Sequence, residues 1–169
     1  MDLQREARNI LVGCEKLVPE FADTIRKVTI RLSTRMTRAT GKAVYRKREI
    51  VLSKAFYDDP ENFQQDFHDT VTHELAHLLM PPIAGRKPHG PEWQRMHLKL
   101  GGNGKRYAPA SLKLAPGYKR RARPKPMRIP CSRCYTLLLV GPTRYKRHLE
   151  HFSRTGKPLY RHQRCPIET

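Results

Sequence analysis

The sequence predicts an α+β protein, in which a compact domain of helices and a small antiparallel sheet precedes a small metal-binding domain. Apolar residues recur with the helical period over residues 3–18 and 63–79. Two short apolar runs between these segments, 28–32 and 49–53, have the length and composition of strands. Near the C-terminus a Cys-x-x-Cys pair stands among basic residues, which favours a metal site over a disulfide.

Three parts are expected along the chain. They are a folded domain at residues 1–115, a basic, proline-containing linker at 116–128 and a small metal-binding domain at 129–169. A length of 169 residues allows one fair-sized core plus an appendage. Neither a membrane span, which needs roughly 18 apolar residues, nor a signal peptide is present in the sequence. We therefore expect a soluble intracellular protein with no membrane partner.

The elements of the first domain follow from local patterns. Residues 3–18 form a helix whose apolar stripe includes Cys14, which we expect to be an inert core residue. Residues 28–32 alternate between apolar and polar side chains, and 49–53 form a second apolar run. Gly41 is interpreted as a turn before the segment 43–45. The patterns do not indicate which strand forms the edge of the sheet.

The next helix carries the most specific motif. Asp59 is a favourable N-cap before Pro60, and the Pro81-Pro82 pair ends the helix. Inside it lies the HExxH pentapeptide, residues 73–77. His73 and His77 stand one turn apart on the same face, so both can bind one zinc ion. The adjacent Glu74 can accept a proton from a water molecule that the metal activates, a combination typical of peptide-bond hydrolysis.

A catalytic zinc site needs a third protein ligand and an open position. The glycine and histidine that closely follow HExxH in metzincins are absent, because prolines occupy that stretch. The downstream candidates are His89, Glu92 and His97. His89 stands immediately before a second short helix that runs to about Leu100, where it can be directed back at the first helix. His97 lies within that helix, where a packing or surface role is expected. We therefore predict His89 as the third ligand.

The C-terminal domain offers a second, structural zinc site with two possible ligand sets. Cys131 and Cys134 form one half in either case. His162 and Cys165 complete a zinc ribbon, whereas His148 and His151 would complete a finger with a helix. The finger has an unusually tight histidine pair and leaves Cys165 without a role. The ribbon is therefore preferred.

Basic residues are concentrated in the C-terminal part of the chain. The chain has 34 Lys and Arg against 15 Asp and Glu, a net charge of +19, and residues 116–169 contain 14 of the former but two of the latter. This asymmetry predicts salt-dependent and largely sequence-independent binding to nucleic acid, and it does not choose between DNA and RNA. The expected contact residues are Lys119, Arg120, Arg121, Arg123, Lys125, Arg128, Arg144, Tyr145, Lys146 and Arg147. Tyr145 is included because an aromatic ring can stack on a base.

The run from Val71 to His77 and the later run from His89 to Trp93 resemble the SprT-like metalloproteases, which include the Spartan proteases that degrade proteins crosslinked to DNA. The resemblance covers about residues 3–165, most tightly 44–101. It implies a compact zincin fold, catalytic zinc on His73, His77 and His89, and Glu74 as general base. It also implies a C-terminal zinc ribbon with a structural zinc. The chain departs from the commonest ribbon pattern at His162, which replaces a cysteine.

The expected function is therefore a DNA-dependent zinc metalloendopeptidase that degrades proteins bound or crosslinked to DNA, located wherever that DNA lies. An edge strand could bind extended substrates with little sequence preference. Tyr107, Arg86 and Arg95 are candidate stabilisers of the oxyanion, and none is distinguished. Two alternatives rank lower: a DNA-binding adaptor with a vestigial zincin domain, and a zinc hydrolase of another bond, such as a phosphodiester.

Overall fold

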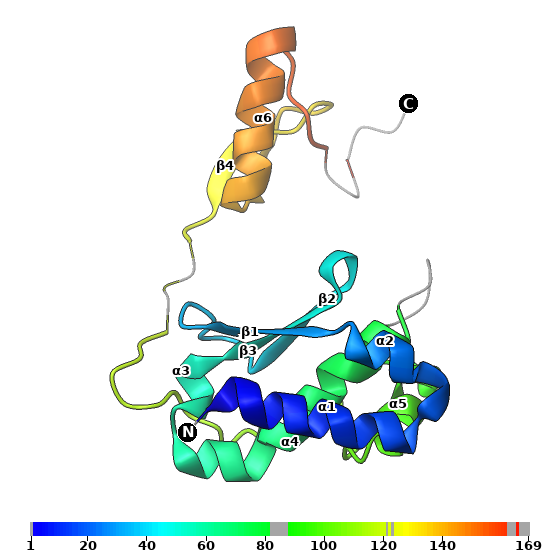
Figure 1. Cartoon of the computed structure of the whole chain (residues 1–169). Coiled ribbons are helices and arrows are strands. Elements are labelled where there is room, and N and C mark those ends of the chain that lie inside the picture. Colours follow the sequence, from blue (N-terminus) through cyan, green and yellow to red (C-terminus); the bar gives the residue numbers. More distant parts are fainter. Residues whose placement is uncertain (1, 82–87, 121, 123, 162–164, 166–169) are drawn as a thin grey trace. The chain divides into compact units, whose positions relative to one another are not determined.

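The computed structural model describes the chain except for residues 1, 82–87, 121, 123, 162–164 and 166–169. The chain divides into two compact units, unit 1 at residues 1–120 and unit 2 at 121–169 (Figure 1). The boundary falls within the segment that composition marks as a linker. None of the described helices has both the length and the apolar character that crossing a lipid bilayer requires.

Unit 1 begins with the helix that periodicity predicts. Helix α1 spans Leu3–Leu17, and the Asp2 carboxylate caps it by accepting hydrogen bonds from the backbone N–H groups of Gln4 and Arg5. Cys14 is 2% exposed within the core, in agreement with a packing role. A 3₁₀ turn, η1 (Pro19–Phe21), and the short helix α2 (Ala22–Arg26) then lead into the sheet.

The sheet of unit 1 is mixed, so the prediction of an antiparallel sheet is wrong in part. Its strands β1 (Thr29–Ser33), β2 (Gly41–Val44) and β3 (Glu49–Ser53) stand in the order β1-β3-β2. Strand β3 pairs in parallel with β1 and antiparallel with β2. Strands β2 and β3 are joined through the turn η2 (Tyr45–Lys47), which ends at Arg48 in the left-handed region, at φ 49°. The two strands that are consecutive in sequence, β1 and β2, are therefore not neighbours, because β3 lies between them.

The buried pattern of β3 explains its central place. Its last four residues are all buried, whereas every residue of β1 and β2 is half-buried or exposed. A continuous apolar run of this kind is typical of a strand covered on both faces. Gly41 is the first residue of β2 and not part of a turn, contrary to the sequence interpretation.

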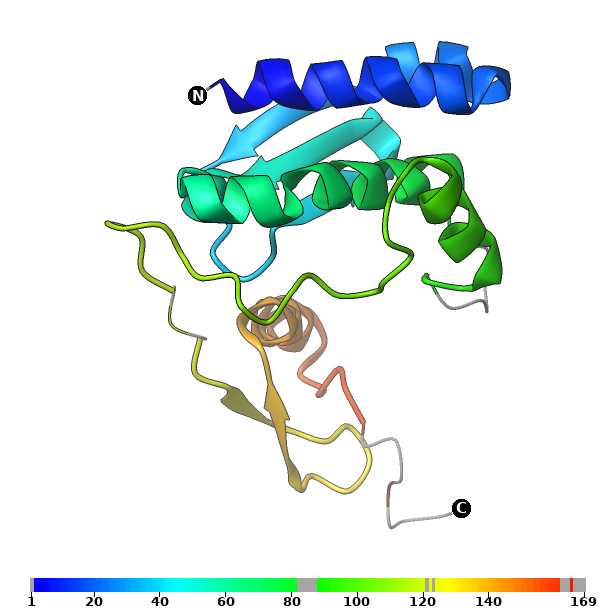
Figure 2. The same ribbon diagram turned by 90° about the horizontal axis from the view of Figure 1, so that it is seen from below.

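Helix α4 (Pro60–Leu79) has the bounds that its capping residues predict. The Asp59 carboxylate accepts hydrogen bonds from the backbone N–H groups of Glu61 and Asn62, and Pro60 occupies the first turn. The helix lies beside α1 across one face of the sheet (Figures 1 and 2). A short helix, α3 (Lys54–Tyr57), precedes it. Buried polar side chains, among them Asp66 and Thr70, show that α4 is covered well beyond its apolar stripe.

The segment that follows α4 closes unit 1. Helix α5 (Pro91–Lys99) packs against α4 and buries Trp93 and Met96. Beyond α5, the side-chain amide of Asn62 donates hydrogen bonds to the backbone oxygens of Phe56, at 2.9 Å, and Lys113, at 2.6 Å. These bonds attach the segment around Lys113 to the N-terminal end of α4.

Unit 2 is a two-stranded antiparallel ribbon with one helix. Strands β4 (Met127–Pro130) and β5 (Leu137–Val140) pair directly, and helix α6 (Pro142–Thr155) packs on β4. Its small interior contains Ile129, Cys131 and Val140. A small interior of this kind is common in domains that a bound metal stabilises.

Candidate active site and metal centres

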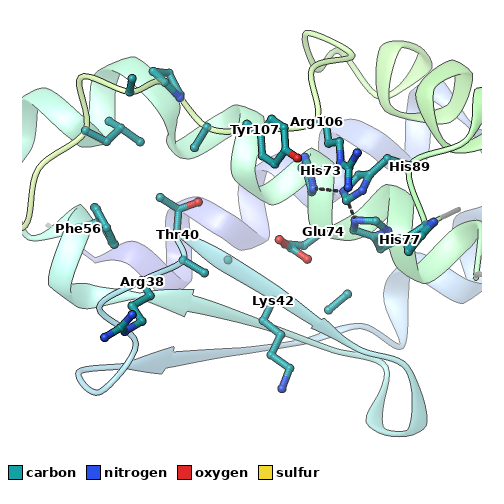
Figure 3. A pocket seen from close by; sticks show the side chains of 18 of the residues that line it. Arg38, Thr40, Lys42, Phe56, His73, Glu74, His77, His89, Arg106 and Tyr107 are labelled. Carbon is teal, nitrogen blue, oxygen red and sulfur yellow. Dashed lines mark hydrogen bonds between the residues drawn. The ribbon is translucent and has the colours of Figure 1, made fainter. Parts of the chain in front are cut away.

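Three histidines from two parts of unit 1 converge at one point. His73 and His77 project from α4, and His89 comes from the residues just before α5 (Figure 3). The Nε2 atom of His89 lies 3.0 Å from Nε2 of His77 and 3.2 Å from Nε2 of His73. Three nitrogens that bind one zinc at the usual bond length of roughly 2.0–2.1 Å are about 3.3 Å apart, so this spacing suits a zinc ion.

The protonation of the three imidazoles also suits a metal. Burial, together with the smaller effect of the other histidines nearby, lowers the pKa of His73 to about 3 and that of His77 to about 4. Burial and the charge of Arg106 lower the pKa of His89. The rings are therefore neutral near pH 7, the form in which an imidazole nitrogen can bind a metal. The residues present thus fit zinc.

Trp93 forms the wall behind the three imidazoles. Its ring is stacked on His77, with centroids 5.3 Å apart, and its centroid lies 4.6 Å from that of His73 and 4.7 Å from that of His89. His97 packs against Trp93 at 5.0 Å and is fully buried, in agreement with the packing role expected for it. This arrangement restricts the rotation of the histidine rings.

Glu74 lies beside the imidazoles and next to strand β2. It is 9% exposed, and the backbone N–H of Ala43 in β2 donates a hydrogen bond to its carboxylate. Burial raises the pKa of this carboxyl to about 7, and the Ala43 hydrogen bond acts in the opposite direction. A carboxyl with a pKa near neutrality can accept and release a proton at physiological pH, as a general base must.

The site opens into a cleft of about 630 Å³. One side is formed by β2 with residues 38–40, and the other by residues 106–110 and Leu112 (Figure 3). Because β2 is an edge strand of the three-stranded sheet, the structure identifies the edge beside the site, which the sequence left open.

Of the two oxyanion candidates that the structure describes, Tyr107 lies at the cleft and Arg95 does not. Tyr107 lines the cleft and is 73% exposed. Arg95 is not among the lining residues and donates a hydrogen bond to the Pro91 carbonyl in its own helix. Arg86 lies outside the described residues. Sequence reasoning missed Arg106, which also lines the cleft and lies over the Tyr107 ring at 5.1 Å.

A second candidate metal centre lies in unit 2. The sulfur atoms of Cys131, Cys134 and Cys165 all lie within 4.8 Å of one another. Hydrogen bonds from Thr136 lower the pKa of the Cys134 thiol, which favours the thiolate that a metal requires. Three converging cysteine sulfurs are ligands typical of a tetrahedral structural zinc site. The fourth predicted ligand, His162, lies outside the described residues.

The alternative finger ligands are placed elsewhere. His148 is 5% exposed inside unit 2, and its Nδ1 accepts a hydrogen bond from the backbone N–H of Leu159 at 3.4 Å. Among the residues that the structure describes, neither His148 nor His151 joins the three cysteines. The arrangement therefore favours the ribbon ligands over the finger ligands.

The predicted nucleic-acid contacts lie mainly on the surface. Seven of them have exposed side chains: Lys119, Arg120, Lys125, Arg128, Arg144, Lys146 and Arg147. Tyr145 is half-buried in α6, and Arg121 and Arg123 lie outside the described residues. We call Arg144, Lys146 and Arg147 the α6 basic cluster.

Comparison with known proteins follows the same division of the chain. A sequence model described as the SprT-like family matches residues 14–113. Proteins named Protein SprT are similar: that of Vibrio parahaemolyticus is 30% identical over 96 residues, 56% of each chain, and that of Pasteurella multocida is 34% identical over 94 residues, 54% of this chain and 55% of that one. The match thus spans about half the length of these relatives.

A solved structure is also similar to part of the chain. It is described as the crystal structure of the metallopeptidase zymogen of Pyrococcus abyssi abylysin. The similarity has a TM-score of 0.42 and 18% sequence identity, and it covers 55% of this chain and 77% of that chain.

Proposed function

This chain belongs to the SprT-like family, and on that premise we propose that it is a zinc-dependent endopeptidase that acts on proteins bound or crosslinked to DNA. The observation that carries the proposal is the convergence of three neutral imidazoles beside Glu74 in an open cleft. His73, His77 and His89 would hold the ion. When bound, zinc supplies Lewis-acid chemistry, which polarises a carbonyl and acidifies water.

Glu74 performs the proton transfers in this proposal. Its carboxylate accepts the proton of the attacking water and then delivers that proton to the nitrogen of the departing amine. Its burial supports the role because the raised pKa brings both steps within reach near neutral pH. Tyr107 and Arg106 line the same cleft, where they could donate hydrogen bonds to the carbonyl oxygen as it gains charge.

Strand β2 is the proposed binding site for the substrate backbone. It lines the cleft, and in the described part of the chain β3 is its one strand partner. An extended peptide can add to such an edge through backbone hydrogen bonds, which read little of its sequence. The proposal therefore includes loose specificity for sequence and a requirement for extended segments.

DNA is the proposed second partner. It is supported by the 14 Lys and Arg among residues 116–169 and by the exposure of the α6 basic cluster. Nucleic acid held by unit 2 would raise the effective concentration of protein substrates on the same DNA. A protease with loose sequence preference is then active mainly where DNA gathers it with its substrate.

The deciding experiment is a cleavage assay on a DNA-binding protein with the zinc-loaded full chain, with and without DNA. We expect DNA-stimulated cleavage that Glu74→Gln abolishes while zinc stays bound. Glu61→Gln is the matched control, because it makes the same change on an exposed residue of the same helix. Absence of cleavage with every form of DNA, together with intact DNA binding, would favour the adaptor function.

A further inference from the structure

We propose that strand β2 sets the position of the catalytic carboxylate, with Gly41 as the residue that makes the fit possible. Gly41 and the hydroxyl cluster, defined as Thr40, Tyr57 and Thr70, are then positioning residues for Glu74. The inference rests on the proposed role of Glu74 as general base. It goes further by assigning a function to residues that touch neither the metal nor the reacting bond.

Gly41 leaves no room for a side chain. A Cβ built on it would lie 2.7 Å from Cγ and 2.9 Å from Oε1 of Glu74, and 2.7 Å from Cγ2 of Thr70. Real Cβ atoms essentially never show contacts shorter than 3.0 Å. Gly41 is not among the glycines with positive φ, so its backbone conformation does not require glycine. The close approach of β2 to α4 does require it.

The hydroxyl cluster fixes the start of β2 at the same place. The Thr70 hydroxyl donates a hydrogen bond to the Thr40 hydroxyl at 3.1 Å, and Thr40 immediately precedes Gly41. The Tyr57 hydroxyl lies 2.6 Å from that of Thr70, and both hydroxyls lie within 2.9 Å of Asp66 Oδ2. Since Thr70 and Glu74 are four residues apart on α4, they share one face. The strand is therefore anchored one turn away from the carboxylate.

Ala43 completes the arrangement. Ala43 lies two residues after Gly41 in β2, and its backbone N–H donates a hydrogen bond to the Glu74 carboxylate. The carboxylate is thus approached by the strand at both residues. Glu74 thus lies between the backbone of β2 and the imidazoles before any substrate enters, as Figure 3 indicates. The same strand that would bind substrate also orients the base.

The test is Gly41→Ala in the zinc-loaded full chain. The new methyl group must displace a neighbour, and the far end of the Glu74 side chain can move more easily than a residue of the helix backbone. We expect kcat to fall about a hundredfold, the cost of an ångström-scale misplacement, with KM changed less than twofold and the zinc content unchanged. A crystal structure of the variant should show the Glu74 carboxylate turned from its place. The control is Gly13→Ala, where a Cβ meets nothing within 4 Å.

Two further variants separate positioning from simple loss of packing. Thr70→Ser added to Gly41→Ala removes the Cγ2 contact but keeps the hydroxyl, so kcat should stay low if crowding of Glu74 is the cause. Thr40→Val removes a hydroxyl without adding an atom to Gly41 and keeps the inference testable if Gly41→Ala fails to fold. It should lower kcat about fivefold, the kinetic equivalent of one neutral hydrogen bond.

Three results would overturn the inference. They are an unchanged kcat in Gly41→Ala, full recovery on adding Thr70→Ser, and a Glu74 carboxylate that keeps its place in the variant structure. Each leaves the proposed function intact if wild type cleaves and Glu74→Gln does not. Conversely, a wild type without activity refutes the proposed function, while the carboxylate position in the variant structure still tests the role of Gly41.

Discussion

The Nε2 atoms of His77 and His89 lie 3.0 Å apart, although twelve positions separate these residues in the sequence and they belong to different structural elements. Two neutral acceptor nitrogens approach this closely only when a proton or a cation lies between them. The relationship therefore makes His89 the candidate third ligand of the metal site and leads directly to a test.

His89→Ala should weaken zinc binding by at least about a hundredfold, because it removes one of three protein ligands. Competition with a chelator of known affinity, monitored by zinc release from the full chain, gives the number. His68→Ala serves as control, since His68 is exposed on the same helix as the other two ligands. Undiminished zinc affinity at the histidine site in His89→Ala would contradict the assignment.

Trp93→Ala should lower the free energy of unfolding by about 3–5 kcal/mol and loosen zinc, because a large buried ring supports all three imidazoles. Trp93→Phe should cost much less, since the Trp93 Nε1 is buried without a hydrogen-bond partner among the described residues. Urea unfolding of the zinc-free chain measures the free energy of unfolding of both variants. Equal losses in the two variants would show that the indole nitrogen matters.

Asp66→Asn should gain stability relative to wild type as the pH rises above 3.8, the usual pKa of this carboxyl. Burial raises the pKa of the Asp66 carboxyl above its usual 3.8. A carboxyl with a raised pKa binds its proton more tightly in the folded chain, so the folded state loses stability as the pH rises through that range. The amide does not ionise and avoids this loss.

Urea unfolding of both proteins at several pH values measures this difference. Asp23→Asn, at a residue whose side chain is 88% exposed, controls for the change in net charge. A difference between Asp66→Asn and wild type that does not depend on pH would contradict the argument.

Cys131→Ser should reduce the zinc content of the purified chain by about one ion, because three cysteine sulfurs converge in unit 2 and one is removed. Atomic absorption measures the loss. Cys14→Ala should keep the full content, since Cys14 is a core residue of unit 1. An unchanged content in Cys131→Ser would count against a metal in unit 2.

Replacing the α6 basic cluster with alanines should flatten the salt dependence of DNA binding. The slope of log K against log salt is negative, and each lost phosphate contact reduces its magnitude by about 0.9. Three lost contacts reduce it by up to about 2.7. Fluorescence anisotropy at several salt concentrations gives the slope. The matched control replaces Arg5, Lys16 and Lys47, which are exposed in unit 1. The same slope in both triple variants would exclude a specific role for α6.

The features of unit 1 that could be predicted are those that short-range chemistry decides. The Asp59 cap and the adjacent proline fix the start of α4, and helical spacing places His73 and His77 on one face. The position of His89 before a second helix was enough to name it as a ligand candidate, and the structure brings it to the other two.

The features that could not be predicted depend on pairing between distant segments. The order β1-β3-β2 arises because β3, last in sequence, inserts between the other two strands, and the one available signal was its continuous apolar run. The hydrogen bond from Ala43 to Glu74 involves a backbone group, which leaves no trace in residue type. Gly41 was interpreted as a turn residue. In sequence, a glycine that allows a strand to approach a helix closely cannot be told from one that allows a turn conformation.

Both walls of the cleft are fastened to one helix. Thr70 holds β2 at one side, and Asn62 binds the backbone at Lys113, next to Leu112, on the other. The strand on one side and the segment at Lys113 on the other are therefore both attached to the helix that carries His73 and His77. The edge strand proposed to bind an extended substrate segment is thus attached to the same helix as the proposed metal ligands and general base.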